Sequence, residues 1–257
     1  MNTQTETTWP ANVRTLAVDI GGSGIKASVL SAQGEMVVDR VRLDTPYPCP
    51  PATLVSTIEK VVSGMGDVQR ASVGFPGLVR GGRVVEVPSL SRRKYDGNAD
   101  ADLAAAWSGF DLGGNLAKIF KVPTKVVNDA DMQGCAVVTG GGMEFVMTLG
   151  TGVGTALFYN SKLLPHLELS HGMYSKKLTI DKALGNVERK SVGNKKWEDR
   201  VHRCIEIFAE MLWFDHIYIG GGNARLLDEK AFGPKTSVIA NSAGIIGGVR
   251  VWELDQR

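Results

Sequence analysis

LAVDIGGSGIKASVL, residues 16–30, runs from one apolar segment through three closely spaced glycines into a second apolar segment. The segments on both sides of the glycines are rich in apolar and β-branched residues, which favours strands over 16–20 and 25–30. No apolar spacing of three or four residues follows Lys26, so a helix is not expected there. The glycines are therefore predicted to form the turn of a β-hairpin.

The same stretch formally matches a dinucleotide-binding fingerprint. Gly22, Gly24 and Ala27 have its spacing, and Asp44 follows about twenty residues later. That fingerprint requires a helix directly after the glycines. Because no helix is expected, an NAD-dependent enzyme is the weaker interpretation.

A second strand–glycine–strand pattern follows about 130 residues later, with strands expected over 144–149 and 155–159. A repeat at this distance indicates a duplicated domain. Other strands are expected over 36–43, 71–74, 125–128 and 216–219, and helices over 53–62, 100–107, 115–120, 131–138, 197–213 and 243–254. Ser242 is the expected cap of the last helix. The chain is predicted to be an α/β protein with lobes over 1–127 and 128–242, and with the helix of 243–257 packing back on the first lobe.

Composition excludes several classes of protein. The 257 residues carry a formal net charge of only +2, so nucleic-acid binding is not expected. No apolar run reaches the length of a membrane span, and the polar N-terminus lacks the apolar core of a signal peptide. The three cysteines are widely spread, which disfavours a disulfide framework. A cytoplasmic protein is expected.

The glycine turns are candidate phosphate sites, because glycine lets backbone N–H groups approach an anion closely. A third glycine run, 220–222, follows the strand of 216–219. The candidate phosphate- or nucleotide-binding residues are Gly21, Gly22, Ser23, Gly24, Lys26, Gly150, Thr151, Gly152, Gly221 and Gly222. Lys26 either neutralises phosphate charge or lies on the exposed face of its strand. Asp19 is a candidate Mg²⁺ ligand, through water, or a turn residue that bonds its own backbone.

VVNDAD, residues 126–131, places carboxylates where a strand gives way to a helix. Asp129 is interpreted as a general base that removes a proton from an attacking hydroxyl, with Asn128 orienting that hydroxyl. The alternative is that Asp129 is the N-cap of the helix. Asp131 competes with Asp129 for the role of base.

With these motifs in place, the chain resembles the sugar kinases of the ROK (repressor, ORF, kinase) family, and among them the bacterial polyphosphate glucokinases. The resemblance is carried, in family order, by DIGGSGIK (19–26), VGFPGLV (73–79), VVNDAD (126–131), LGTGVGTALF (149–158), LELSH (167–171), IGGG (219–222) and NSAGIIGG (241–248). It implies a duplicated actin/hexokinase-like (ribonuclease H-like) fold with a central cleft.

The resemblance also implies a reaction. Asp129 would be the catalytic base for phosphoryl transfer from polyphosphate or ATP, with Mg²⁺, to a hexose hydroxyl, with the 6-hydroxyl of glucose preferred. The glycines at 220–222 would contact a nucleoside when ATP is the donor. The implied sugar-binding residues are Gly77, Ser89, Asn128, Glu168 and His171.

Three departures from the family pattern qualify these expectations. No cysteine lies between Cys135 and Cys204, so the family's Cys-rich motif is missing and no structural zinc is expected. Ser170 replaces the glycine of the usual E-x-G-H pattern, and Ser89 stands near the place of a sugar-contacting Asn. Another hexose, or a cyclic polyol such as inositol, therefore remains an alternative acceptor.

Residues 176–203 bear on the donor, because they hold nine Lys or Arg against four acidic residues, a local net charge of +5. Such a segment either follows a long polyanion such as polyphosphate or is a solvated loop and helix face. Two rival functions remain. A sugar-responsive repressor would need a DNA-reading domain, for which the roughly fifteen residues before the first strand are too few. A non-catalytic sugar-binding module is the other, and a homodimer is expected.

Overall fold

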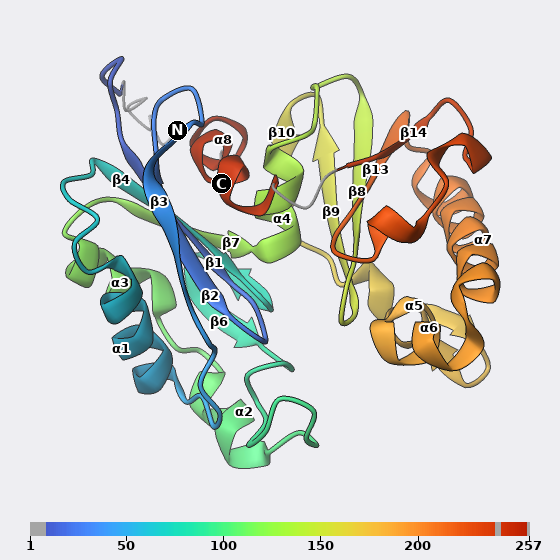
Figure 1. Ribbon diagram of the computed structural model, residues 1–257, viewed down its shortest axis with the longest axis horizontal. Helices are drawn as coiled ribbons and strands as arrows, with labels where there is room; N and C mark the ends of the chain where they lie inside the picture. The colour runs from blue at the N-terminus through green and yellow to red at the C-terminus, as the bar shows by residue number, and fades with distance from the viewer. Residues whose placement is uncertain (1–8, 240–242, 256–257) are drawn as a thin grey trace, which may run out of the picture.

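Two five-stranded sheets organise the computed structural model, which describes residues 9–239 and 243–255 (Figure 1). The strand order of the first sheet is β3-β2-β1-β4-β7. Its strands are β1 (Thr15–Ile20), β2 (Ile25–Leu30), β3 (Met36–Leu43), β4 (Arg70–Phe75) and β7 (Thr124–Asn128). We call the part of the chain built on this sheet the first lobe and the part built on the other sheet the second lobe.

The second sheet repeats the arrangement of the first, with the order β10-β9-β8-β13-β14. Its strands are β8 (Met143–Leu149), β9 (Val153–Tyr159), β10 (Lys162–Leu163), β13 (His216–Gly220) and β14 (Thr236–Val238). In both sheets the first three strands are antiparallel and the last two are parallel to the third. The predicted duplication is therefore confirmed at the level of topology.

Both glycine turns join antiparallel strands. Ile20 pairs with Ile25 across the first turn, and Leu149 pairs with Val153 across the second. No helix follows the glycines at residues 21–24, so the hairpin prediction is correct and the dinucleotide-binding interpretation is excluded.

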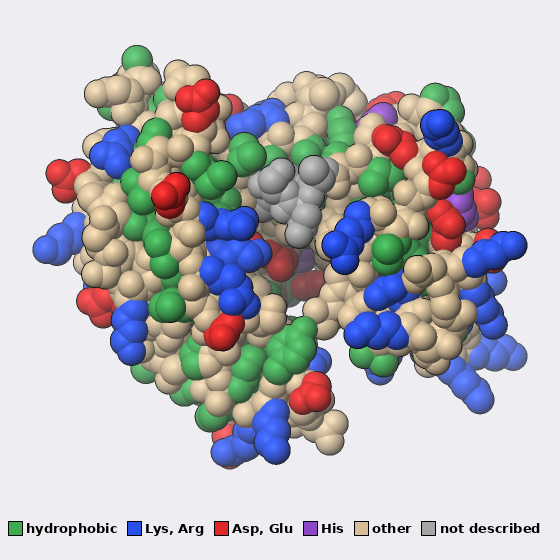
Figure 2. Space-filling view, viewed as in Figure 1, with side chains coloured by type: hydrophobic (Ala, Val, Ile, Leu, Met, Phe, Trp, Pro, Cys, Tyr) green, Lys and Arg blue, Asp and Glu red, His purple; other side chains and the backbone are tan. Residues whose placement is uncertain are grey.

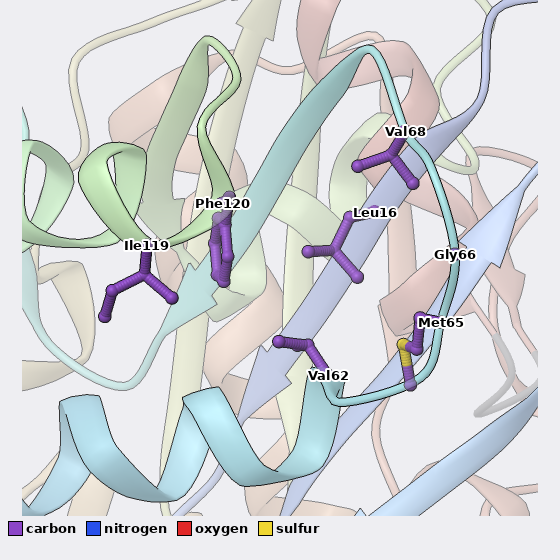
Figure 3. Close-up of a pocket in the computed structure, with 7 residues that line it drawn as sticks. All are labelled: Leu16, Val62, Met65, Gly66, Val68, Ile119 and Phe120. Carbon is purple, nitrogen blue, oxygen red and sulfur yellow. The ribbon is translucent and has the colours of Figure 1, made fainter.

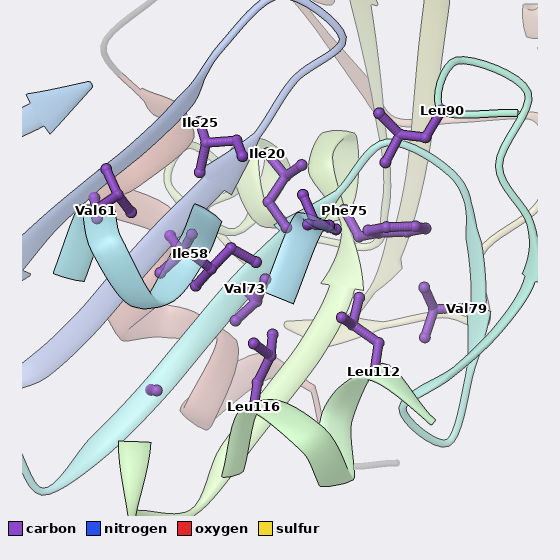
Figure 4. Packing of buried hydrophobic residues seen from close by; sticks show 14 of the residues in the cluster. Ile20, Ile25, Ile58, Val61, Val73, Phe75, Val79, Leu90, Leu112 and Leu116 are labelled. Carbon is purple, nitrogen blue, oxygen red and sulfur yellow. The ribbon is translucent and has the colours of Figure 1, made fainter. Parts of the chain in front are cut away.

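The core of the first lobe lies between its sheet and a layer of helices (Figure 4). Ile58, Phe75 and Leu116, from a helix, a strand and a second helix, are fully buried there. The helices are α1 (Pro51–Val62), α2 (Ala101–Trp107) and α3 (Leu112–Phe120), and a small hairpin of β5 (Leu78–Arg80) and β6 (Arg83–Glu86) lies beside them. The hairpin was not expected from the sequence.

The second lobe packs its longest helix, α7 (Asn194–Leu212), against the second sheet, as the apolar spacing over 197–213 predicted. Phe208 of α7 packs on Phe145 of β8 with ring centroids 4.9 Å apart. The remaining elements are a small sheet of β11 (Met173–Ser175) and β12 (Leu178–Thr179), α5 (Ile180–Leu184), α6 (Asn186–Val192) and the short 3-10 helices η1 (Leu169–His171), η2 (Ala224–Leu226) and η3 (Glu229–Ala231).

Two helices, α4 (Asp129–Cys135) and α8 (Ala243–Leu254), lie between the sheets (Figure 1). The expected bounds of α4, 131–138, were wrong: the helix begins two residues earlier, because Asn128 caps it. Ser72 on β4 donates to the carbonyl oxygen of Gly248 at 2.6 Å, so α8 lies against the first sheet. Ser242, the expected cap of α8, lies outside the described residues. We propose lobe limits of 1–127 and 128–242 on this basis.

Within the described ranges, none of the helices combines the length and the apolar character needed to cross a lipid bilayer.

Candidate active site

Three side chains hold the first glycine turn in place by donating hydrogen bonds to its carbonyl oxygens. Thr45 donates to the carbonyl oxygen of Gly21 at 2.6 Å, and Tyr47 donates to that of Gly22 at 2.8 Å. The Arg42 guanidinium donates to the carbonyl oxygen of Ser23 at 3.0 Å. Three successive peptide units are thus fixed in orientation by the end of β3, which holds Arg42, and by the segment that follows it.

This arrangement leaves the backbone N–H groups on the other side of the turn without hydrogen-bond acceptors among the described residues. In a trans peptide the N–H points opposite to the carbonyl that precedes it, so the N–H groups of Gly22, Ser23 and Gly24 point away from the three side chains. None of these amides donates to an acceptor among the described residues. Three adjacent unpaired N–H groups form the kind of concavity that binds an anion.

The second glycine turn has the same construction with different supports. The backbone N–H of Asn186, where α6 begins, donates to the carbonyl oxygens of Gly150 and Thr151 at 3.1 and 3.2 Å. Asp181 accepts the N–H of Val153 at 2.8 Å. The N–H groups of Thr151 and Gly152 again have no acceptor within the part of the chain that the structure describes.

The third glycine run lies against the second turn. Gly221 has φ +86°, and a Cβ there would come within 2.4 Å of the carbonyl oxygen of Leu149, so only glycine fits. Asn223 donates its side-chain N–H to the carbonyl oxygen of Gly150 at 3.0 Å. The residues predicted to bind a nucleotide, Gly221 and Gly222, are therefore next to the turn predicted to bind phosphate.

Tyr95 connects the two turns across the lobes. Its hydroxyl lies 3.1 Å from the Thr151 hydroxyl, and a Cβ on Gly22 would be 3.5 Å from its ring. Its ring packs edge-on against Tyr47 with centroids 6.1 Å apart. Figure 2 shows the surface hollowed between the lobes, with acidic side chains visible inside and Lys and Arg side chains along the first-lobe rim.

Asp129 is the first residue of α4 and is partly buried. Burial raises the pKa of its carboxyl group, and the charges of Asp19 and Glu168 raise it further. The backbone N–H of Ala130 and the charge of His166 lower it, and the net result is a pKa of about 7. Groups from the first hairpin, from α4 and from the segment after β10 therefore act on one carboxylate.

Asn128 is the N-cap of α4, so the N-cap interpretation of Asp129 was wrong. The side-chain oxygen of Asn128 accepts the N–H of Ala130 at 2.8 Å, and its side-chain N–H donates to the carbonyl oxygen of Gly77 at 3.1 Å. Asn128 is buried and links the helix to the turn after β4. The Asp129 carboxylate accepts the N–H of Ala130 at 2.9 Å.

Asp19 and Lys26 face each other across the first hairpin and form an ion pair at 3.1 Å. The Lys26 side chain is about one-third exposed, so it lies at the edge of the site while bound to its partner. The Asp19 side chain is 14% exposed.

The donor groups present fit Mg²⁺ better than a metal held by protein alone. No group of three His, Cys, Asp or Glu side chains suited to a metal exists among residues 9–239 and 243–255. Mg²⁺ keeps several waters and is commonly bound by one or two carboxylates and substrate phosphates. Asp19, at the end of β1 beside the unpaired amides, has the chemistry for that role.

The segment after β10 brings further polar groups to the site. Glu168 lies 3.9 Å from Nε2 of His171, and the His171 side chain is half exposed. His166, which the sequence did not single out, is buried between Asp131 and Glu168. Ser89 is partly buried, and its hydroxyl is 3.4 Å from the carbonyl oxygen of Pro76, in the same turn as Gly77.

A small pocket elsewhere in the first lobe lacks the chemistry of an active site (Figure 3). Its volume is about 160 Å³. Its lining is Leu16, Val62, Met65, Gly66, Val68, Ile119 and Phe120, with no charged side chain.

Comparison with known proteins finds relatives that span most of the chain. A model of the ROK family matches residues 15–168. Polyphosphate glucokinase from Mycobacterium tuberculosis (strain CDC 1551 / Oshkosh) is 30% identical over 244 residues, which span 90% of this chain and 88% of that protein.

Solved structures agree on the fold. The inorganic polyphosphate/ATP-glucomannokinase from Arthrobacter sp. strain KM superposes with a TM-score of 0.78 at 24% identity, covering 94% of this chain and 99% of that one. A ROK family glucokinase from Streptomyces griseus, in complex with glucose and AMPPNP, superposes with a TM-score of 0.65 at 18% identity, covering 91% and 97%. The fold is the actin/hexokinase-like duplication expected from the sequence.

Proposed function

Because this chain belongs to the ROK family, we propose that its site transfers a phosphoryl group from polyphosphate or ATP to a hexose hydroxyl. The chain is a phosphotransferase of the sugar-kinase type. The proposed acceptor is the 6-hydroxyl of glucose, and another hexose or a cyclic polyol such as inositol is the alternative. The observation that carries this proposal is the set of unpaired turn amides in the two hairpins, which the Tyr95 hydroxyl links across the lobes.

The proposed reaction uses Asp129 as the base. The carboxylate takes the proton of the acceptor hydroxyl as the oxygen forms its bond to the terminal phosphorus, and the bond from that phosphorus to the rest of the donor breaks. ADP or a shortened polyphosphate leaves. Catalysis of phosphoryl transfer consists mostly of positioning and charge stabilisation.

The remaining candidates have supporting roles in this proposal. The turn amides and Lys26 bind donor phosphates, and residues 220–222 contact the nucleoside when ATP is used. Gly77 and Ser89 surround the acceptor from the first lobe, and Asn128 does so from the boundary between the lobes. Glu168 accepts hydrogen bonds from the hydroxyls of the acceptor, and His171 donates to them or accepts from them. Mg²⁺, when bound, would neutralise phosphate charge, with Asp19 holding it through water.

A panel assay tests the proposal. Glucose, other hexoses and cyclitols are each incubated with ATP or polyphosphate, in Mg²⁺ and in EDTA, and phosphorylated product is measured by mass spectrometry. Product that depends on Mg²⁺ supports the proposal and identifies the acceptor. If no acceptor and donor pair gives product while sugar binding is measurable by calorimetry, the chain is a non-catalytic sugar-binding protein instead.

The pH dependence of the rate should report the Asp129 carboxyl group. Only the ionised carboxylate can accept the acceptor's proton, and the pKa of Asp129 is about 7. We therefore expect kcat to rise with pH through a midpoint near 7 and then to level off. An acidic limb near pH 4, where an ordinary Asp titrates, would contradict the assignment.

Basic side chains next to the second turn should affect one donor more than the other. Lys182 on α5 and Lys190 on α6 are exposed, and both helices adjoin the turn of residues 150–152. A long polyphosphate would extend past them, whereas ATP would not. We expect Lys182→Glu with Lys190→Glu to raise KM for long-chain polyphosphate roughly tenfold at low salt and to leave KM for ATP within about twofold.

The matched control is Lys60→Glu, an exposed lysine on α1 of the first lobe. It should change neither KM. Equal changes for both donors in the α5 and α6 variant would argue against a polyphosphate track at this place.

Two further expectations stay as proposals. Cys49 and Cys204 are buried free thiols, which fits a reducing compartment such as the cytoplasm. A homodimer is expected, and sedimentation of the full chain tests it.

A further inference from the structure

A series of three charged side chains, Asp131, His166 and Glu168, connects α4 to the segment after β10. Nδ1 of His166 lies 3.0 Å from Oδ1 of Asp131, and Nε2 lies 3.4 Å from Oε1 of Glu168. The side chains of His166 and Asp131 are 2% and 1% exposed, and that of Glu168 is 25% exposed. Of the three side chains, Glu168 alone is accessible to solvent, so the series ends in one accessible carboxylate.

Two members of this series, Asp131 and His166, are fixed by neighbouring elements of the site. Asp131 lies two residues after Asp129 on the same short helix. The guanidinium of Arg80, on β5 of the first lobe, donates to the backbone carbonyl of His166 at 2.6 Å. The His166 backbone is thus held by the first lobe while its ring is held by α4.

The two carboxylates make His166 a cation. Burial alone would lower the pKa of its imidazole, but hydrogen bonds and charges from Asp131 and Glu168 raise that pKa to about 9. With a carboxylate beside each nitrogen, both nitrogens carry protons at neutral pH. Burial alone would raise the pKa of Glu168, but the hydrogen bond and charge of His166, together with the charges of His171 and Arg80, outweigh burial, so this pKa is lowered.

We propose that His166 is a positioning residue, which holds Glu168 as an oriented, ionised carboxylate for the hydroxyl groups of the acceptor. This inference rests on the proposed function, in which Glu168 contacts the acceptor. A carboxylate with one oxygen paired at 3.4 Å with a buried imidazolium has fewer accessible orientations, and its second oxygen remains available. It therefore accepts hydrogen bonds from polyol hydroxyls with less loss of side-chain freedom on binding.

The charge of His166 also acts on the base. The charged groups that face Asp129 are Asp19 and Glu168, which raise its pKa, and His166, which lowers it. The charged groups that lower the pKa of Glu168 are His166, His171 and Arg80, and all of them favour its ionised form. Removing the imidazolium takes away the cation that acts on Asp129, so the pKa of Asp129 must rise.

The test compares His166→Gln with the wild-type chain in steady-state kinetics from pH 5 to 9. Gln keeps an N–H donor for Glu168 and loses the charge. We expect KM for the acceptor to rise roughly tenfold, with kcat on its high-pH plateau within about threefold. We also expect the acidic limb of kcat to move to higher pH. A variant that is merely destabilised would not raise the acceptor KM at an unchanged kcat, and it would not move the acidic limb of kcat.

A second variant protects the test against failure to fold. Loss of the imidazolium leaves Asp131 as a buried charge that has lost its cation, which is strongly destabilising. Asp131→Asn with His166→Gln removes both charges together and should show the same KM change, with a smaller displacement of the acidic limb because an anion is lost along with the cation. His202→Gln is the matched control, because His202, on α7, stacks on Phe232 with ring centroids 4.2 Å apart.

The outcomes separate the two proposals. A folded His166 variant with unchanged acceptor KM and an unmoved acidic limb overturns the positioning role and leaves the kinase intact. A wild-type chain that phosphorylates no sugar or cyclitol overturns both.

Discussion

Asp129→Asn should lower kcat by about 10²- to 10⁴-fold, the usual contribution of a general base. Asparagine has nearly the shape of aspartate, and its side-chain oxygen can still accept the Ala130 N–H that Asp129 accepts at 2.9 Å. What it lacks is the ability to take a proton at neutral pH. The remaining turnover would come from positioning of donor and acceptor.

The same substitution should leave the protein at least as stable as the wild-type chain. The pKa of Asp129 is raised by burial from 3.8 to about 7, so the folded chain binds this proton more tightly than the unfolded chain. The wild-type free energy of unfolding therefore falls as pH rises between these two values. A neutral asparagine side chain carries no such cost, and at pH 8 the Tm of the variant should equal or exceed that of the wild type.

Asp102→Asn is the matched control. Asp102 is on α2 with its side chain 95% exposed, and its loss should change neither kcat nor Tm. Turnover of Asp129→Asn within tenfold of the wild type would show that another group is the base.

Gly247→Ala should be the most damaging substitution of a single small residue. Gly247 lies on α8, and a Cβ there would be 1.7 Å from the carbonyl oxygen of Met132 on α4. Backbone atoms cannot move aside as a flexible side chain can, so the two helices must separate. Overpacking of this kind typically costs about 1–3 kcal/mol, which for a chain of this size lowers Tm by several degrees.

Activity should fall further than stability in this variant. Met132 is three residues from Asp129, so a displaced α4 also displaces the base. A misplacement of about 1 Å costs on the order of 100-fold in rate. Tm by calorimetry and kcat at 25 °C measure the two effects on one preparation.

Gly233→Ala serves as the control, because a Cβ at that exposed glycine meets nothing within 4 Å. It should change neither quantity. If Gly247→Ala had the same Tm and kcat as Gly233→Ala, the close approach of α4 and α8 would not be needed to keep the two helices in position.

Local patterns in the sequence predicted the strands and hairpins well. The alternation over 36–43 and the absence of helical spacing after Lys26 describe short-range geometry, and β3 and the first hairpin match the predicted bounds. The start of α4 was missed because the capping residue is Asn128, which the sequence suggested only as a group that orients the acceptor hydroxyl. The choice between Asn128 and Asp129 depends on Gly77, which is distant in sequence and accepts the Asn128 side-chain N–H.

The supports of the site were less predictable than its motifs. Thr45 and Tyr47 hold the first turn from 24 and 25 residues away, and nothing in their own neighbourhood indicates that task. His166 is 35 residues from Asp131, and its role exists only once α4 and the segment after β10 meet. Sequence motifs indicate the residues that contact a ligand. Which residues support them depends on tertiary contacts, which local sequence patterns do not show.

The position of α4 has a consequence for motion within the molecule. This helix contacts β4 and β7 of one sheet and β8 and β9 of the other. If one half of the molecule rotates against the other with these contacts kept, the axis of rotation must pass near α4. Points near an axis move least, so Asp129 would stay almost still while both glycine hairpins swing through larger arcs.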